Sequence, residues 1–140
     1  MIHEATKRIQ ARLKQDDLKC QVYEREETSW LEIQISTEQF NLEIDFFSAD
    51  EDPDVSVRVI GLVKGSADKR EALLQTCNAL NRRFRYAKFT LDDDNDVNME
   101  YDFPLKTPMD VVDEVATECI SRFLSISKKA YPELMKALWA

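Results

Sequence analysis

Three aspartates at alternating positions are the residues of this 140-residue chain whose spacing is closest to that of a metal site. Asp92, Asp94 and Asp96 follow the D-x-D-x-D pattern with which a calcium-binding EF-hand loop begins. Such a loop needs Gly at position six and a bidentate Glu at position twelve, where this chain has Val97 and Phe103. The flanking apolar residues alternate with period two, whereas an EF-hand has helices on both sides. The pattern therefore favours the turn of a β-hairpin, with cation binding as the alternative.

The chain offers little material for the common catalytic centres. Its only histidine, His3, lies in an N-terminal helix end that is expected to fray, which disfavours histidine-based catalysis and mixed Cys/His zinc sites. The three cysteines have no C-x-x-C spacing, and two glycines, Gly61 and Gly65, cannot build a phosphate-binding glycine loop. We expect a protein that is not an enzyme and has no catalytic residues, no metal and no cofactor. An enzyme that uses carboxylates alone is the remaining alternative.

Composition and charge limit the partners. The 27 acidic residues outnumber the 19 basic ones, for a formal net charge of −8, which argues against a polyanionic partner such as nucleic acid. No apolar run approaches the roughly 20 residues that span a bilayer, and the first residues lack the apolar segment of a secretory signal. We therefore expect no nucleic-acid or membrane partner and a cytoplasmic location.

Hydrophobic periodicity predicts an α+β fold. Apolar residues recur at helical spacing over residues 2–15, 68–84 and 107–130, and Pro132 can begin a short final helix. They alternate with period two over residues 18–22, 31–35, 40–46, 55–63, 87–91 and 97–103, with short polar connections that suit hairpins. The expected order is α-β-β-β-β-α-β-β-α-α. It gives a mostly antiparallel sheet of five or six strands with helices on one face, in a single domain over residues 1–140.

The strand alternation places a set of acidic residues on the sheet face opposite the helices. This face is a solvated surface with a few ion pairs, mainly from Arg58 and Lys88, or a docking surface for a basic segment. Two tryptophans are candidate anchors, because aromatic residues are enriched in interface cores; each could instead pack under a loop. The candidate partner-binding residues are thus Trp30, Glu32, Glu43, Asp45, Glu100, Asp102 and Trp139.

The chain resembles the YbjN-type domains, a bacterial family described as sensory-transduction regulators with a fold similar to that of type III secretion chaperones. The matching stretches are LEIQISTEQFNLEIDF, the segment LLQTCNALNRRFRYAKFTLDDD with Asn78 and Asn81, and VNMEYDFPL before the last long helix. The resemblance covers residues 2–139. It implies a non-catalytic module, chaperone-like or a regulatory adaptor, that binds another protein or a second copy of itself as a homodimer. The alternative function is a small-ligand or divalent-cation binder that uses the acidic loops 48–54 and 92–96.

Overall fold

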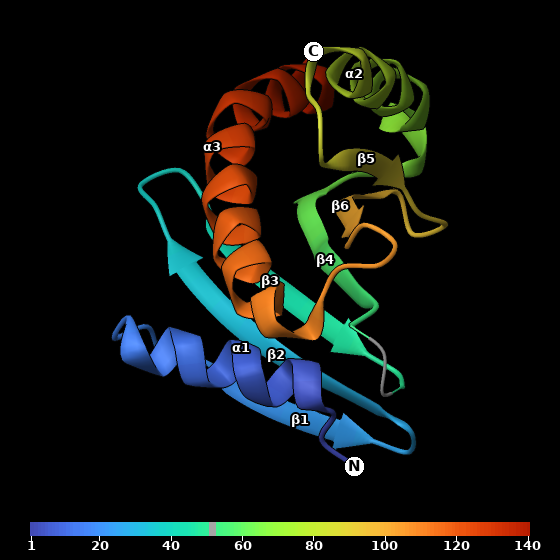
Figure 1. Cartoon of the computed structure of the whole chain (residues 1–140). Coiled ribbons are helices and arrows are strands. Elements are labelled where there is room, and N and C mark those ends of the chain that lie inside the picture. Colours follow the sequence, from blue (N-terminus) through green and yellow to red (C-terminus); the bar gives the residue numbers. More distant parts are fainter. Residues whose placement is uncertain (51–52) are drawn as a thin grey trace. The chain divides into compact units, whose positions relative to one another are not determined.

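The computed structural model of the chain describes residues 1–50 and 53–140 and has the predicted α+β class (Figure 1). The helices are α1 (Glu4–Gln15), α2 (Arg70–Arg83) and α3 (Val112–Trp139), and single 3₁₀ turns at Ala67–Lys69 and Met109–Val111 precede α2 and α3. The strands are β1 (Gln21–Arg25), β2 (Thr28–Ser36), β3 (Asn41–Ser48), β4 (Val55–Lys64), β5 (Lys88–Leu91) and β6 (Asp96–Asp102). They form one open antiparallel sheet with the strand order β1-β2-β3-β4-β6-β5.

The contacts within the chain divide it into two compact units. The first comprises residues 1–58 and 102–120, and the second comprises residues 59–101 and 121–140. Strand β4 and helix α3 each contribute one part to each unit. Each unit has its own set of buried apolar side chains.

In the first unit, α1 packs on β2 and β3 because both elements have one apolar face. Along β2 the side chains alternate between buried and more exposed positions, as expected for a strand with one covered face. Helix α1 has its buried apolar side chains at helical spacing, Ala5, Ile9 and Leu13. The main buried residues of the two strands are Leu31, Ile33, Leu42, Ile44 and Phe46.

The N-terminal end of α1 is fixed to β2, contrary to the expectation that it frays. His3 is only 3% exposed, and its backbone N–H donates to the hydroxyl of Ser29 at 3.0 Å. The same hydroxyl hydrogen-bonds to Thr6 at 2.8 Å, and the His3 ring hydrogen-bonds to the Glu27 carbonyl. The buried Ser29 therefore joins the first turn of α1 to the sheet, which the sequence pattern alone did not indicate.

In the second unit, α2 packs against β5, and Asn81 joins the two elements. The Asn81 amide donates to the Phe89 carbonyl at 3.0 Å, and the Phe89 N–H donates to the Asn81 carbonyl oxygen at 2.6 Å. Strand β5 lies at the edge of the sheet, with β6 as its only neighbouring strand in the strand order. The Asn81 side chain thus hydrogen-bonds to both backbone groups of Phe89 on the outer side of β5, where a further strand could otherwise pair. Asn81 was part of the family resemblance, but its role was not predicted.

Two element boundaries differ from those expected. Strand β1 begins at Gln21 instead of Leu18, because Leu18 still belongs to the C-terminal cap of α1. Asp17 has a φ of 61°, and the Leu18 N–H donates to the Leu13 carbonyl, as in a helix C-cap. The predicted final helix from Pro132 is the C-terminal part of α3, which continues through that residue. The buried Ala130 and Leu134 on either side of Pro132 keep one apolar stripe continuous, and packing of this stripe offsets the missing N–H of the proline.

Candidate functional site

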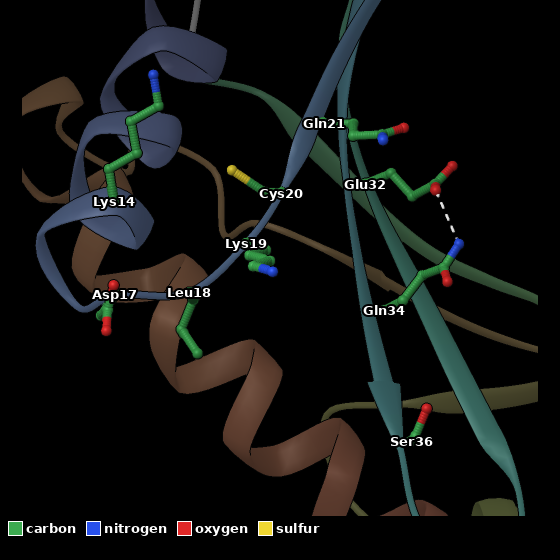
Figure 2. Close-up of a pocket in the computed structure, with 9 residues that line it drawn as sticks. All are labelled: Lys14, Asp17, Leu18, Lys19, Cys20, Gln21, Glu32, Gln34 and Ser36. Carbon is green, nitrogen blue, oxygen red and sulfur yellow. Dashed lines mark hydrogen bonds between the residues drawn. The ribbon is translucent and has the colours of Figure 1, made fainter.

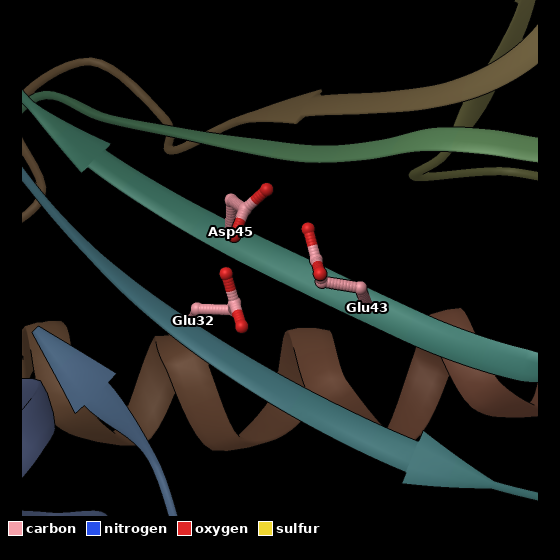
Figure 3. Close-up of side chains that lie close together, drawn as sticks. All are labelled: Glu32, Glu43 and Asp45. Carbon is pink, nitrogen blue, oxygen red and sulfur yellow. The ribbon is translucent and has the colours of Figure 1, made fainter. Parts of the chain in front are cut away.

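Three carboxylates gather on the polar face of β2 and β3. The strand pairing places Glu32 directly opposite Asp45, and Glu43 lies two residues before Asp45 on the same face. One oxygen of each carboxylate lies within 4.8 Å of the others, which makes this the one set of three metal-ligating side chains in the described residues (Figure 3). We call these three residues the acidic cluster. The sequence predicted their common face, and the register between the strands brings them together.

Two polar neighbours flank the acidic cluster. The Gln34 amide donates to Glu32 Oε1 at 3.1 Å and to Glu43 Oε1 at 3.5 Å. Arg58 lies directly opposite Asp45 on β4, and its Nη1 donates to the carboxylate of Asp102 and to the Val57 carbonyl, both at 2.9 Å. The predicted role of Arg58 as a counterion on this face is thereby confirmed for Asp102.

Asp45 is the unusual member of the acidic cluster, because it is buried. Its side chain is 7% exposed, whereas Glu43 is exposed and Glu32 is half-buried. Burial, together with the negative charges of Glu43 and Glu32, raises the pKa of the Asp45 carboxyl to about 7. Near neutral pH this carboxyl therefore binds a proton far more readily than an ordinary aspartate does.

A row of aromatic rings crosses the same sheet face next to the acidic cluster. Trp30 stacks on Tyr23 of β1 with ring centroids 5.4 Å apart, and it packs at a tilt against Phe47 of β3 at 5.7 Å. All three rings keep some exposure, which reaches 38% for Tyr23. We call these three residues the aromatic row. Tyr23 and Phe47 were not among the predicted site residues, but they are the direct cross-strand partners of Trp30, so a correct register would have found them.

A groove of about 860 Å³ runs beside the acidic cluster, between the end of α1 and β2 (Figure 2). It forms because β1 pairs with β2 only as far as Glu32, which leaves the rest of β2 without a partner on that side. The half-buried Cys20 lines it, and burial raises the pKa of this thiol. The lining residues are Lys14, Asp17, Leu18, Lys19, Cys20, Gln21, Glu32, Gln34 and Ser36.

The remaining predicted site residues lie elsewhere. Glu100 lies directly opposite Lys88 across β5 and β6 of the second unit, and this register is all that the structure gives for the predicted ion pair. Trp139 is 76% exposed near the end of α3 and lines a shallow hollow with Leu138 and the segment that precedes α2. It is therefore not tucked under a loop.

The acidic turn of residues 92–96 is a β-hairpin turn between β5 and β6, as predicted. The carboxylate of Asp92 accepts hydrogen bonds from the N–H groups of Asp94 and Asp96 and from the side-chain amide of Asn98. These donors lower the pKa of Asp92 and occupy its oxygens within the turn. In the other acidic loop, 48–54, residues Glu51 and Asp52 lie outside the described part of the chain.

The fold and the site define an α+β protein whose candidate site lies on an open sheet face. The sequence from residue 6 to residue 135 matches the model of the YbjN family, described as "Putative bacterial sensory transduction regulator". The chain belongs to this family, and the resemblance inferred from the sequence is confirmed. No curated protein matches the chain. The family description is that of a regulator and names no enzymatic activity. Among the described residues, no helix combines the length and the apolar character needed to cross a membrane.

Proposed function

We propose that the chain is a non-catalytic regulatory module that binds a basic segment of another protein on the sheet face formed by β1, β2 and β3. The observation that carries this proposal is the aromatic row beside the acidic cluster. A stacked set of partly exposed rings offers apolar area that is already ordered, so little side-chain entropy is lost on binding. Three carboxylates next to it supply the charge that a lysine or arginine side chain complements.

The aromatic row and the acidic cluster contribute to binding in different ways. Rings of the Trp30 type are typical binding hot spots and can also hold a guanidinium group by stacking. Carboxylates such as Glu43, which stays exposed, attract a basic partner over a distance and mainly raise its association rate. A partner segment should therefore combine lysine or arginine with an aromatic or aliphatic residue nearby. Self-association as a homodimer remains a separate proposal, for which the exposed Trp139 is the candidate contact.

A peptide-display selection on the immobilised chain, in buffer with EDTA and low salt, tests the proposal. It should enrich peptides with lysine or arginine close to an aromatic or aliphatic residue. Dissociation constants of these peptides should rise by a factor of about 10 or more with Trp30→Ala and with Glu43→Gln, since each removes one part of the surface. The association rate should fall as the salt concentration rises.

Glu38→Gln is the matched control, because Glu38 is an exposed acid in the turn after β2 and away from both parts of the surface. It should leave the dissociation constant unchanged. Thermal unfolding of every variant shows whether the fold is kept. The proposal fails if no basic peptides are enriched, or if folded Trp30→Ala and Glu43→Gln variants bind them as the wild type does.

A further inference from the structure

The acidic cluster concentrates negative charge on a small area of the sheet. Glu32 and Asp45 are direct cross-strand partners, and like charges in this position destabilise a sheet. With Glu43, three carboxylates each place an oxygen within 4.8 Å of the others. A sheet face with many polar positions could have separated these groups at little cost. A proton on Asp45 relieves part of this repulsion, and a cation bound between the three carboxylates would relieve all of it.

Gln34 and Arg58 are the two polar neighbours of the cluster whose hydrogen bonds are described. Gln34 donates to both glutamates but carries no charge. Arg58 sends its Nη1 group to Asp102, on the side of β4 away from the cluster's glutamates. Burial and the two glutamates dominate the environment of Asp45.

A second observation concerns the buried carboxyl of Asp45 itself. Its Oδ1 atom is inaccessible to water and has no hydrogen-bond partner among the described residues, although the whole side chain is 93% buried. A buried acceptor that lacks a donor is costly, and a native fold keeps one where something else satisfies it. Figure 3 shows this carboxyl beside those of Glu32 and Glu43, on the same side of the two strands.

We propose that Glu32, Glu43 and Asp45 bind a divalent cation that prefers oxygen ligands, and that Ca²⁺ fits the site best. Three oxygens within 4.8 Å of one another lie at most about 2.8 Å from a common centre, so small side-chain rotations reach the roughly 2.3 to 2.6 Å of Ca–O bonds. Mg²⁺ needs about 2.0 to 2.1 Å and a near-regular octahedron, whereas Ca²⁺ accepts a variable number and arrangement of oxygen ligands. Glu43 is exposed, so water can complete the coordination.

This site differs from the acidic loops considered from the sequence. In the turn of residues 92–96, backbone and amide donors already occupy the Asp92 carboxylate. In the acidic cluster, Gln34 donates to both glutamates, and the carboxyls of Asp45 and Glu43 share one hydrogen bond. Asp45 Oδ1 thus lacks a hydrogen-bond partner among the described residues, whereas the carboxylate of the turn accepts three hydrogen bonds.

Isothermal titration of Ca²⁺ into the EDTA-treated 140-residue chain tests the inference. We expect a saturable heat with one site per chain and a dissociation constant on the order of 10⁻⁴ M, as for exposed sites with few carboxylates. Glu43→Gln, at an exposed position that should not disturb folding, should weaken binding by about tenfold or more. Asp94→Asn, in the hairpin turn, is the control and should bind as the wild type does.

Terbium luminescence places the ion independently. Trp30 lies two residues from Glu32 on the same face, so it should sensitise the emission of bound Tb³⁺, and Ca²⁺ should quench this emission by displacement. Trp30→Phe should remove the emission but keep the Ca²⁺ heat, and Trp139→Phe should change neither.

Three results would overturn the inference: no saturable heat up to about 10 mM Ca²⁺, well above the range of weak calcium modules; unchanged Ca²⁺ affinity in Glu43→Gln; or loss of binding in Asp94→Asn. Both tests use the protein without a peptide. A failure here therefore leaves the proposed binding of a basic segment untouched, and the reverse holds as well.

Discussion

Asp45 shows how one buried side chain can make the stability of the fold depend on pH. In the unfolded chain its pKa has the ordinary value of 3.8, whereas in the folded protein burial and two glutamates raise the pKa to about 7. Between these two values the folded state keeps the proton that the unfolded state loses. The stabilisation from this proton is complete below pH 3.8 and is lost as the pH rises through about 7.

Asp45→Asn should therefore flatten the pH profile of stability, because asparagine has no proton to lose. From pH 5 to pH 8 in EDTA, the free energy of unfolding of the wild type should fall by roughly 2 to 3 kcal/mol more than that of the variant, at about 1.4 kcal/mol per pH unit. Urea unfolding at the two pH values measures the difference. Glu38→Gln, at an exposed turn position, should keep the wild-type profile. Parallel profiles for the wild type and Asp45→Asn would show that Asp45 titrates normally.

At the scale of elements, the outer side of β5 depends on a side chain from a helix. Asn81 of α2 makes two hydrogen bonds to the backbone of Phe89, one as donor and one as acceptor. Asn81 thereby makes the two hydrogen bonds that a neighbouring strand would make to Phe89, and its side chain blocks the pairing of another chain at this edge. The Phe89 side chain is itself buried, so its backbone position matters for the core of the second unit.

Asn81→Ala should lower the free energy of unfolding by about 1 to 3 kcal/mol, because it leaves the N–H and C=O groups of Phe89 without their partner. Asn78→Ala is the matched control, since Asn78 is exposed one turn earlier on the same helix. It should change stability by less than about 0.5 kcal/mol. Urea unfolding gives both values, and hydrogen exchange at the Phe89 amide should be faster only in Asn81→Ala. Equal effects of the two substitutions would mean that the Asn81 bonds contribute nothing particular.

The sequence could predict the elements because each has its own period, but it could not predict the pairings. Alternation placed Trp30, Glu32 and Asp45 on one face of the sheet, and this is how the structure has them. The burial of Asp45 and the stacking of Tyr23 on Trp30 depend on cross-strand register, which no pattern within one strand contains. Asn81 and Ser29 were missed for the same reason, since their partners lie on other elements.

At the scale of the whole molecule, a net charge of −8 favours both cations and basic peptides, so the two proposed ligands are linked. A calcium ion on Glu32, Glu43 and Asp45 would neutralise the carboxylates that attract a basic segment. Ligands that share one set of groups weaken each other by the same factor, whichever is added first. If both proposals hold, calcium would thus regulate partner binding through the charge of the sheet face.

We therefore expect Ca²⁺ to weaken the binding of a selected basic peptide. With Ca²⁺ at about ten times its own dissociation constant, simple competition raises the dissociation constant of the peptide about tenfold. Fluorescence anisotropy with and without Ca²⁺ measures this factor, and sodium chloride at matched ionic strength corrects for general screening. In Glu43→Gln the factor should fall to about two or less, because Ca²⁺ binds that variant about tenfold more weakly or worse. If peptide affinity in the wild type is the same in Ca²⁺ and in the sodium chloride control, the two ligands do not share the acidic cluster, and the peptide must bind mainly through the aromatic row.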